Sequence, residues 1–248
     1  MLKFFRKIRQ NLLSEGKTGA YLKYAMGEIV LVVIGILIAL QINNWNINEQ
    51  QRKIEVKYLT EIRDNLKKDL SDIDFNIDFN QNKSQSNKIV LDYLDGKIDY
   101  ADSLEFHFSN LLFTTRTVVN MSAYENLKSR GLEIITNDSL RQRITTLYEY
   151  EFNNAIDFET KDDHEFQYQI LIPEVTKALN IIEFNAARGY PSGLARPIDE
   201  NLLVDNYSLR NALKINYTLR GYMTTNYQYL KADVEACIAH IEKELKNK

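Results

Sequence analysis

The amino-acid sequence predicts an all-α protein, and three observations support this class. Glycine and proline, which interrupt helices, number only 9 and 3 among the 248 residues. Apolar residues recur at steps of three and four over long stretches, as they do along one face of an α-helix. One apolar run near the start is long enough for a membrane-spanning helix. We therefore expect an N-terminal amphipathic helix and a transmembrane helix that continues into an elongated antiparallel helical bundle.

The first segment, residues 1–20, is expected to be a basic amphipathic helix on the cytoplasmic side. In LKFFRKIRQNLL, apolar side chains such as Phe5 and Ile8 cover one face, and cationic ones such as Arg6 and Lys7 cover the other. A cationic face with aromatic anchors suits the surface of an anionic membrane leaflet. A basic flank that only sets the topology of the following span is the alternative interpretation.

Residues 21–46 are expected to form the transmembrane helix. Ile29 to Leu40 holds ten Ile, Val or Leu residues and no charge, which contribute roughly −3 to −6 kcal/mol to membrane insertion. Residues 25–45 would span about 31 Å as a helix, close to the thickness of the hydrocarbon core. Small residues let two such helices approach each other, and tryptophan favours the membrane surface. The residues expected to anchor the helix in the bilayer are Glu28, Gly35, Ala39, Asn43, Asn44 and Trp45.

Three other interpretations of the apolar run compete with a membrane anchor. A core helix of a soluble protein is normally amphipathic or shorter. A cleaved signal peptide needs a small-x-small site after the run, where ALQ and INN stand instead. The run EIVLVVIGILIAL is similar to the stem of a type IV pilin, but the pilin cleavage motif would require glycine at Lys23. An uncleaved signal anchor fits the sequence best.

Flanking charge predicts the orientation of this anchor. Residues 1–24 carry six basic side chains and one acid, whereas residues 46–63 carry four basic side chains and three acids. Because basic flanks tend to stay on the cytoplasmic side, we expect a cytoplasmic N-terminus and an extracytoplasmic domain over residues 47–248.

The extracytoplasmic domain is expected to begin as a continuation of the membrane helix. Its apolar positions recur at three- and four-residue steps, which suits a coiled coil or packing inside a helical bundle. These positions are Leu59, Ile62, Leu66, Leu70, Ile73 and Ile77. The polar stretch NQNKSQSN, residues 80–87, is predicted to be the first turn of the domain.

Capping residues predict helix ends farther along the chain. Ser122, with Glu125 three residues later, matches a capping box, and Gly131 is placed to end that helix. Asn137 to Ser139 offer caps for a long helix that follows.

The remaining elements complete the predicted bundle. Ser103 is expected to cap a short helix, and Pro173 marks a kink or a new helix start. GYPSGLARP, residues 189–197, is the clearest loop because it holds two prolines and two glycines. A last amphipathic helix is expected from Ser208 to the C-terminus, with Cys237 on its apolar side as a packed thiol.

The stretch YENLKSRGLEIITNDSLR is the local feature that most resembles an interaction site. It concentrates polar groups around two helix ends, where backbone N–H groups can receive an anion. A network of caps that only fixes the turn would use the same residues. The possible interaction turn consists of Tyr124, Asn126, Lys128, Arg130, Asn137 and Arg141.

The sequence contains no known catalytic or cofactor motif, so we expect neither an enzyme nor a bound cofactor. The richest metal candidate is ETKDDHEF, with Glu159, Asp163 and His164 in helical reach, although a solvated acidic face has the same composition. The 15 tyrosines and 11 phenylalanines would line a ligand pocket or fill the core. The net charge of −3 gives no basic footprint, so no nucleic acid is expected as a partner.

Three stretches carry a resemblance to a known family: MLKFFRKIRQNLLSE, GEIVLVVIGILIALQINNWN and YENLKSRGLEIITNDSLR. By these stretches the chain resembles a family of single-pass membrane proteins from Bacteroidota, grouped as a domain of unknown function. The resemblance implies a Gram-negative inner-membrane protein with a periplasmic domain. It implies no activity, and it transfers no catalytic residue to this chain.

Taken together, these expectations favour an uncharacterised inner-membrane protein whose helical periplasmic domain binds another protein or a second copy of itself. Its expected role is that of a scaffold or accessory subunit, with the lipid bilayer as its other partner. The alternative is a periplasmic ligand-sensing module that signals through a membrane partner. A periplasmic hydrolase is a third class, and the sequence lacks every motif that it should contain.

Overall fold

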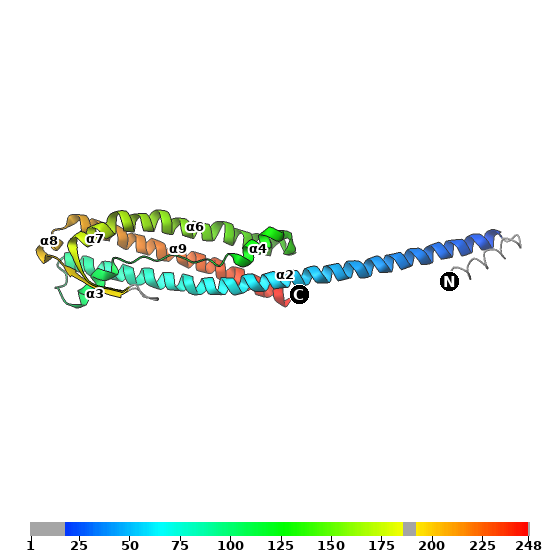
Figure 1. Ribbon diagram of the computed structural model, residues 1–248, viewed down its shortest axis with the longest axis horizontal. Coiled ribbons are helices and arrows are strands. Elements are labelled where there is room, and N and C mark those ends of the chain that lie inside the picture. The colour runs from blue at the N-terminus through cyan, green and yellow to red at the C-terminus, as the bar shows by residue number, and fades with distance from the viewer. Residues whose placement is uncertain (1–17, 186–191, 248) are drawn as a thin grey trace. The chain divides into compact units, whose positions relative to one another are not determined.

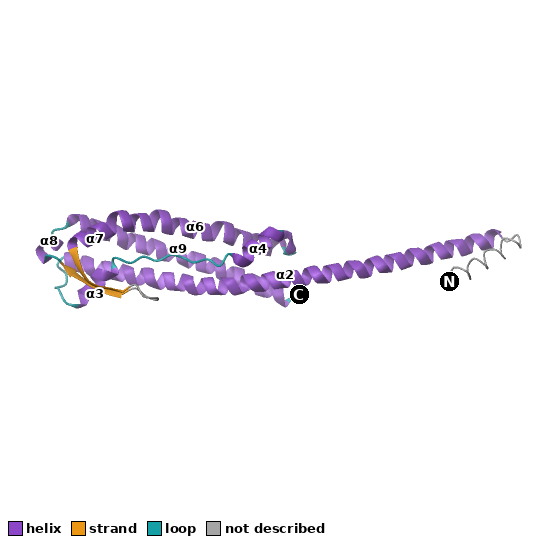
Figure 2. Cartoon of the chain, viewed as in Figure 1, coloured by secondary structure: helices purple, strands orange, loops and turns teal. Residues whose placement is uncertain are grey.

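The computed structural model describes residues 18–185 and 192–247, and it separates into two units, Met1–Ile54 and Glu55–Lys248. Helix α2 (Thr18–Leu94) contributes its first part to one unit and the remainder to the other. Apart from one pair of short strands, the regular structure of the described residues is helical, which confirms the expected class (Figure 2).

In the first unit, the apolar part of α2 is open to its surroundings. Every large apolar side chain from Ile29 to Leu40 is between 47% and 70% exposed, which argues against the core helix of a soluble domain. The stretch is long and apolar enough to cross a membrane. Of the amphipathic helix predicted for residues 1–20, all but residues 18–20 lie outside the described part of the chain.

Three long helical stretches lie side by side in the second unit (Figure 1): α2 from Glu55 onward, residues 138–178, and α9 (Tyr207–Lys246). Shorter elements connect them in the order α3 (Ser103–Asn110), an extended segment, α4 (Ser122–Arg130), the 3₁₀ turn η1 (Leu132–Ile134), a hairpin and α8 (Glu200–Val204).

Helix α9 runs antiparallel to α2, as expected. Lys67 of α2 pairs with Glu242 near the end of α9, with 2.7 Å between Nζ and Oε1. At the opposite end, Arg210 from the start of α9 donates to the carbonyl of Leu94, where α2 ends. The two helices are therefore paired from the level of Lys67 to the end of α2.

The 138–178 stretch runs parallel to α2 and not antiparallel to it. Thr136, just before this stretch, donates its N–H to Glu55 at 2.9 Å, and Gln167 accepts from Lys83 farther along both helices. A parallel pair requires the chain to return between the two helices. Residues 111–121, a turn followed by a stretch without regular secondary structure, make this return along the surface of α2 (Figure 1).

The 138–178 stretch alternates α-helical and π-helical turns. Its parts are α5 (Asp138–Thr146), η2 (Leu147–Glu151), α6 (Phe152–Asp157), η3 (Phe158–His164), η4 (Gln167–Leu171) and α7 (Ile172–Ala178), of which the η segments are π-helical. Buried positions recur at four-residue steps: Ala155, Glu159, Asp163, Gln167, Leu171 and Val175. In a pure α-helix each such step would rotate the side chain by about 40°. The wider π-turns offset this rotation and keep the six side chains on the inner face.

The segment predicted as the clearest loop supplies a β-strand instead. β1 (Leu179–Asn185) pairs antiparallel with β2 (Ser192–Pro197). The hairpin packs on α3, where the Ser109 hydroxyl donates to the Gly193 carbonyl at 2.6 Å (Figure 2). Glycine and proline indicated a loop, yet proline is tolerated at a strand end and on an edge strand. Residues 189–191 of that predicted loop lie outside the described residues.

The predicted caps hold only in part. Asn137 caps α5 by accepting an N–H of its first turn, as expected. Met121 precedes α4 and no side chain caps that helix, so the capping box predicted at Ser122 is wrong. Gly131 does end α4, at φ 112°, and there a side chain would also meet the Glu133 carboxylate.

Two other helix starts shift by a residue. Ser103 is the first residue of α3, whose preceding Asp102 makes no side-chain cap. The last helix begins at Tyr207, one residue before the predicted Ser208, because Asn206 accepts an N–H of the first turn.

The turn predicted at residues 80–87 is wrong, because α2 continues without a break to Leu94. Half of the polar side chains of this stretch are interior, since Asn80, Lys83, Ser86 and Asn87 are buried, whereas Gln81, Asn82 and Gln85 are exposed. The buried side chains belong to a polar layer that separates two apolar clusters of the second unit. We define the polar layer as Asn76, Asn80, Lys83, Ser86, Asn87, Glu159, Asp163, Gln167, Asn216 and Arg220.

The two apolar clusters lie on either side of this layer. The first contains five members of the predicted seam, Leu59, Ile62, Leu66, Ile73 and Ile77, and Leu70 packs against it, so the seam packs inside the bundle. It also contains Cys237, whose thiol pKa burial raises to about 12, and the expected packed thiol is confirmed. The second cluster joins the end of α2, α3, α7, the hairpin and the start of α9.

Candidate functional site

The residues predicted to anchor the first unit lie along one exposed helix. Gly35 has no other atom within 4 Å of the position a side chain would take, and Ala39 is exposed. Trp45 is 68% exposed, and its neighbours Asn43 and Asn44 are exposed as well. These positions are open to lipid or to another helix, so their anchoring role stays a prediction.

Tyr124, the first residue of the predicted interaction turn, is an interior side chain. Its ring stacks on Tyr148 with 4.5 Å between centroids. Its hydroxyl donates to Glu149 at 2.8 Å, and burial together with this carboxylate raises the pKa of Tyr124. Lys128 reaches the same carboxylate at 2.6 Å and, with Tyr124, lowers the pKa of Glu149.

Asn137 and Arg141 fix the entry into α5. The Asn137 side chain accepts the Leu140 N–H at 3.1 Å and donates to Glu244 at 2.7 Å, which ties α5 to the end of α9. Arg141 donates to the Ile135 carbonyl at 2.8 Å. The partners of these side chains therefore lie within the domain, which favours a cap network as their role.

Asn126, Lys128 and Arg130 lie exposed on α4. The structure thus gives four of the six predicted residues contacts within the unit, and Lys128 is at the surface as well. Whether the turn of these six residues binds a partner stays a prediction.

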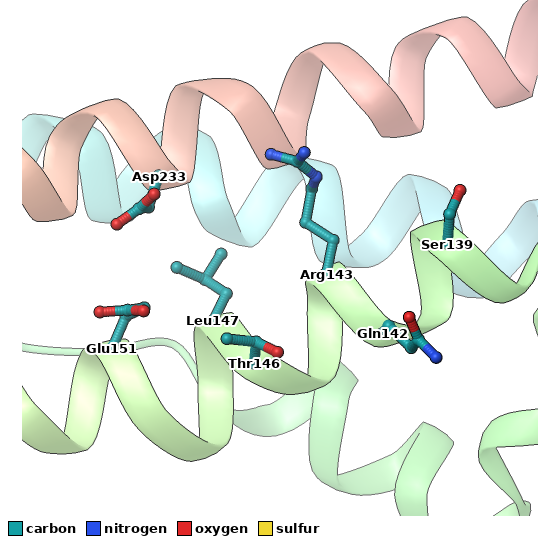
Figure 3. A pocket seen from close by; sticks show the side chains of 7 residues that line it. All are labelled: Ser139, Gln142, Arg143, Thr146, Leu147, Glu151 and Asp233. Carbon is teal, nitrogen blue, oxygen red and sulfur yellow. The ribbon is translucent and has the colours of Figure 1, made fainter.

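An open pocket of about 300 Å³ lies beside this turn, between the α5–η2 segment and α9 (Figure 3). Its lining residues are Ser139, Gln142, Arg143, Thr146, Leu147, Glu151 and Asp233. Figure 3 shows the Arg143 guanidinium extending toward α9, and the carboxylates of Glu151 and Asp233 approaching each other from facing helices. Burial and then the Asp233 charge raise the pKa of Glu151. Sequence reasoning missed this pocket because its two walls lie far apart in the chain.

A second and more apolar groove, of about 440 Å³, lies between η3–η4 and α9. Its lining residues are Lys161, Asp162, Glu165, Phe166, Gln169, Ile170, Ile215, Leu219 and Tyr222. Ile170, Ile215 and Tyr222 are each more than 40% exposed, and the Phe158 ring packs edge-on against Tyr222 at 5.4 Å. Large apolar groups in an open groove are typical of a surface that binds another protein.

A sequence signal for this groove existed. Ile215, Tyr222 and Tyr229 are spaced by seven residues, so they form one stripe along α9. The stripe lies outside the packed face of α9 that Leu213, Met223 and other buried positions form. The sequence predicts that its tyrosines line a ligand pocket or fill the core, but Tyr222 and Tyr229 are 44% and 68% exposed.

Two carboxylates of the acidic stretch considered for metal binding, Glu159 and Asp163, are buried, whereas Asp162 and Glu165 are exposed. Asp163 pairs with buried Arg220 and accepts from the Thr114 hydroxyl at 2.8 Å. Glu159 accepts from the hydroxyl of buried Tyr227 at 2.8 Å. Within the described residues, no group of three or more His, Cys, Asp or Glu side chains is arranged to hold a metal ion.

Lys83 occupies the centre of the polar layer. Its Nζ donates to the Phe113 carbonyl and to Gln167 Oε1, the latter at 2.8 Å. Gln167 then donates to Asn216 at 2.6 Å, and Asn216 donates to Asn87 at 2.9 Å, so this chain of bonds links all three long helices. Complete burial and then the nearby Arg220 charge lower the pKa of Lys83 well below its usual value.

Helix side chains also hold the extended segment at residues 111–121. Its backbone N–H groups would need strand partners in a sheet, but here carboxylates accept them. Thr117 N–H donates to Glu159 at 2.8 Å, and Val118 N–H donates to Asp72 at 2.9 Å. The polar layer therefore fixes the return of the chain as well as the three helices.

Comparison with known families adds one assignment. The profile of a family of unknown function (DUF6090) matches residues 28–167, more than half of the chain. The chain belongs to this family. The matched residues include most of the apolar run of α2, the predicted interaction turn and the α2 side of the polar layer. No curated protein and no solved structure matches the chain.

Membership of DUF6090 confirms the expected family of unknown function, and it transfers no activity, membrane topology or source to this chain. Residues 168–247, which include most of the apolar groove on α9, lie beyond the matched part. The family match therefore gives no role to this groove.

Proposed function

We propose that this DUF6090 protein is a membrane-anchored scaffold or accessory subunit whose helical unit binds another protein. The observation that carries the proposal is the apolar groove between η3–η4 and α9. Ile170, Ile215 and Tyr222 line this groove and leave 44% to 55% of their surface exposed. Burial of these side chains against a partner would contribute favourable free energy of about 25 cal/mol per Å² of apolar surface.

The first unit supplies the tether in this proposal. Its apolar stretch is long enough to span a bilayer, and the excess of basic residues before it supports a cytoplasmic N-terminus. The helical unit would then lie in the periplasm of a Gram-negative cell, next to the inner membrane. A protein so placed can concentrate a partner at the membrane without any chemistry of its own.

The interior of the helical unit supports a binding role more than an enzymatic one. Asp163 and Glu159 are engaged by Arg220, Tyr227 and the extended segment, and they do not face an open cavity. A catalytic acid or base must be able to reach a substrate. The exposed polar groups of the Arg143 pocket are the exception, and they support the second proposal below.

The groove can be tested in native membranes with the full chain. A photo-crosslinking amino acid at Ile215 or Tyr222 is expected to capture one protein, identified by mass spectrometry. A second substitution in the groove, Ile170→Asp, should reduce the captured amount at least tenfold, because a carboxylate replaces an apolar contact. The matched control is Tyr150→Asp, which alters a side chain that is 63% exposed on another face.

Two results would contradict the scaffold proposal. One is the absence of any protein adduct from the groove positions under conditions that capture known neighbours in the same membrane. The other is an adduct whose yield is the same with Ile170→Asp as with Tyr150→Asp.

The Arg143 pocket favours a ligand-sensing module as the second candidate function. It presents one guanidinium and two facing carboxylates in an open hollow, a set of charges that suits a small zwitterionic molecule (Figure 3). Native mass spectrometry of the extracted full chain should then show a small-molecule adduct that Arg143→Ala removes. An unliganded mass for the freshly extracted protein would count against sensing.

A further inference from the structure

The end of the helical unit that carries α8 combines two unusual surface properties. Figure 1 shows α8 at the same end of the unit as α3 and the last turns of α2. Two short segments meet there, residues 95–102 after α2 and residues 198–207 around α8. Arg210 connects them, because its guanidinium donates to the Val204 carbonyl at 3.0 Å and pairs with Asp95 at 3.3 Å.

The first property is apolar exposure. Leu202 and Tyr207 are each 72% exposed, more than any large apolar side chain of the membrane-spanning stretch, where Leu31 reaches 70%. Ile198 is 63% exposed and lies two residues before α8. A folded protein rarely leaves neighbouring large apolar side chains this open unless another surface covers them.

The second property is a concentration of negative charge. Residues 95–102 and 198–207 together carry six carboxylates and one lysine, whereas the whole chain has a net charge of only −3. Asp95 is paired with Lys97 and Arg210. Among the described residues, the remaining five make no ion pair: Asp99, Asp102, Asp199, Glu200 and Asp205.

The local structure holds this surface in place. Asp199 caps α8 by accepting the N–H groups of Asn201 and Leu202 at 2.9 and 3.1 Å. Leu203 points the other way and is buried in the second apolar cluster. The Arg210 guanidinium lies over the Tyr207 ring at 5.7 Å. The exposed apolar side chains are thus presented from an ordered base, which lowers the entropic cost of binding.

We infer that the α8 end is a docking surface for a protein segment in which lysine or arginine residues surround apolar side chains. Leu202, Tyr207 and Ile198 form the apolar centre, and the unpaired carboxylates form the rim. Interfaces of this kind obtain affinity from central apolar anchors and on-rate from complementary rim charges. The inference rests on the proposed scaffold role and adds a second binding surface, whose residues do not line the groove on α9.

Charge argues against two other occupants. A second copy of the chain docked symmetrically through this end would bring the two acidic rims together, which is repulsive. An anionic membrane surface would repel the same carboxylates. A basic protein segment is the occupant that satisfies both the centre and the rim.

Site-specific photo-crosslinking in the full-length protein tests this inference. p-Benzoylphenylalanine replaces Leu202 or Tyr207 in native membranes, with Tyr150, which is 63% exposed, as the comparison position. We expect a protein adduct from Leu202 and Tyr207 whose crosslinked peptide has more basic than acidic residues. Circular dichroism of each variant checks that the helical unit is folded.

Charge reversal then tests whether the Leu202 adduct depends on the carboxylates of the rim or arises from adventitious contact. Glu200→Lys with Asp205→Lys should reduce the Leu202 adduct at least tenfold, and added salt should reduce it in the same direction. The matched control reverses two exposed acids elsewhere, Asp78→Lys with Glu125→Lys, and should leave the adduct unchanged.

Several outcomes would overturn the inference. These are an acidic crosslinked peptide, adducts only to lipid or to a second copy of the chain, an adduct that survives charge reversal at the rim, and no adduct from either α8 position. If the groove positions Ile215 and Tyr222 still capture a protein in the last case, only the α8 surface is wrong. If no position captures a protein, the proposed scaffold function is wrong as well.

Discussion

The polar layer and the first apolar cluster occupy neighbouring levels of the same three helices, yet they are built in opposite ways. The cluster around Leu66, Ile144 and Val234 uses side chains that need only volume and contact. The polar layer around Lys83 and Arg220 uses side chains that each require a specific partner on another helix. The apolar cluster tolerates exchange among apolar residues, whereas the polar layer fixes which helices are neighbours and in what register they pack.

The difference also concerns what a single change leaves behind. A truncated leucine leaves a cavity, and the surroundings can partly collapse into it. A removed arginine leaves a buried carboxylate that has lost its countercharge, and no rearrangement of apolar groups can replace it. The polar layer should therefore be the more fragile level of the bundle, although it contributes less apolar burial.

The largest effect is expected for Arg220→Met. This change leaves Asp163 buried without its cation and removes the donor to Asn80, so unfolding should become easier by about 3–5 kcal/mol. Urea unfolding of the full chain in detergent, followed by circular dichroism, measures the loss. Adding Asp163→Asn should recover a substantial part of it, because no uncompensated charge then remains.

The stability recovered by Asp163→Asn distinguishes a lost countercharge from lost side-chain packing as the cause of the destabilisation. Leu66→Ala in the apolar cluster, expected to cost about 2–5 kcal/mol, should gain nothing from Asp163→Asn. If the second change fails to improve Arg220→Met, the buried pair is not the reason for its cost.

A pH-dependent effect of intermediate size is expected for Lys83→Met. The folded-state pKa of Lys83 is lowered, so above that pKa the unfolded state binds more protons and the native protein gains stability as pH rises. This gain is at most about 1.4 kcal/mol per pH unit, and it is lost as pH falls through the folded-state pKa. The unfolding free energy of the native protein minus that of the Lys83→Met variant should therefore increase as pH rises.

Urea titrations at several pH values between about 7 and 9.5 measure this slope. Leu66→Ala provides the comparison, because its cost should not depend on pH in the same range. A flat difference for Lys83→Met would mean that Lys83 is charged inside the bundle throughout.

The smallest effect is expected at Asp69, where the polar contacts meet the first apolar cluster. Burial raises its pKa, Oδ1 accepts the Asn120 N–H at 3.1 Å, and among the described residues the buried Oδ2 has no hydrogen-bond partner. A group with a raised pKa contributes stability below its unfolded-state value of 3.8 and loses it as pH rises through the folded-state value. Asp69→Asn should thus be stabilising at neutral pH, by about 1 kcal/mol or less.

The same urea titration, repeated at acidic pH, checks the sign, since the advantage of Asp69→Asn should shrink as Asp69 becomes protonated. A loss of stability at neutral pH would show that the Asp69 charge itself is required.

Sequence reasoning found the features of this molecule that depend on near neighbours. The seam at Leu59, Ile62 and Leu66 is buried as its spacing predicts, and Asn137 and Gly131 mark helix ends for local reasons of hydrogen bonding and backbone conformation. It failed where a polar residue is interior. Residues 80–87 have the composition of a turn, and no local signal reveals that Lys83 meets Gln167 or that Asn87 meets Asn216.

The sequence by itself determined the apolar stretch from Ile29 to Leu40, the helical class and several helix ends, because hydropathy and backbone preference act over a few residues. Only the tertiary structure decided that the 138–178 stretch runs parallel to α2, that residues 192–197 form a strand, and that a polar layer crosses the core. Those outcomes depend on partners brought from distant parts of the chain. A buried charge or amide is stable only where such partners meet it.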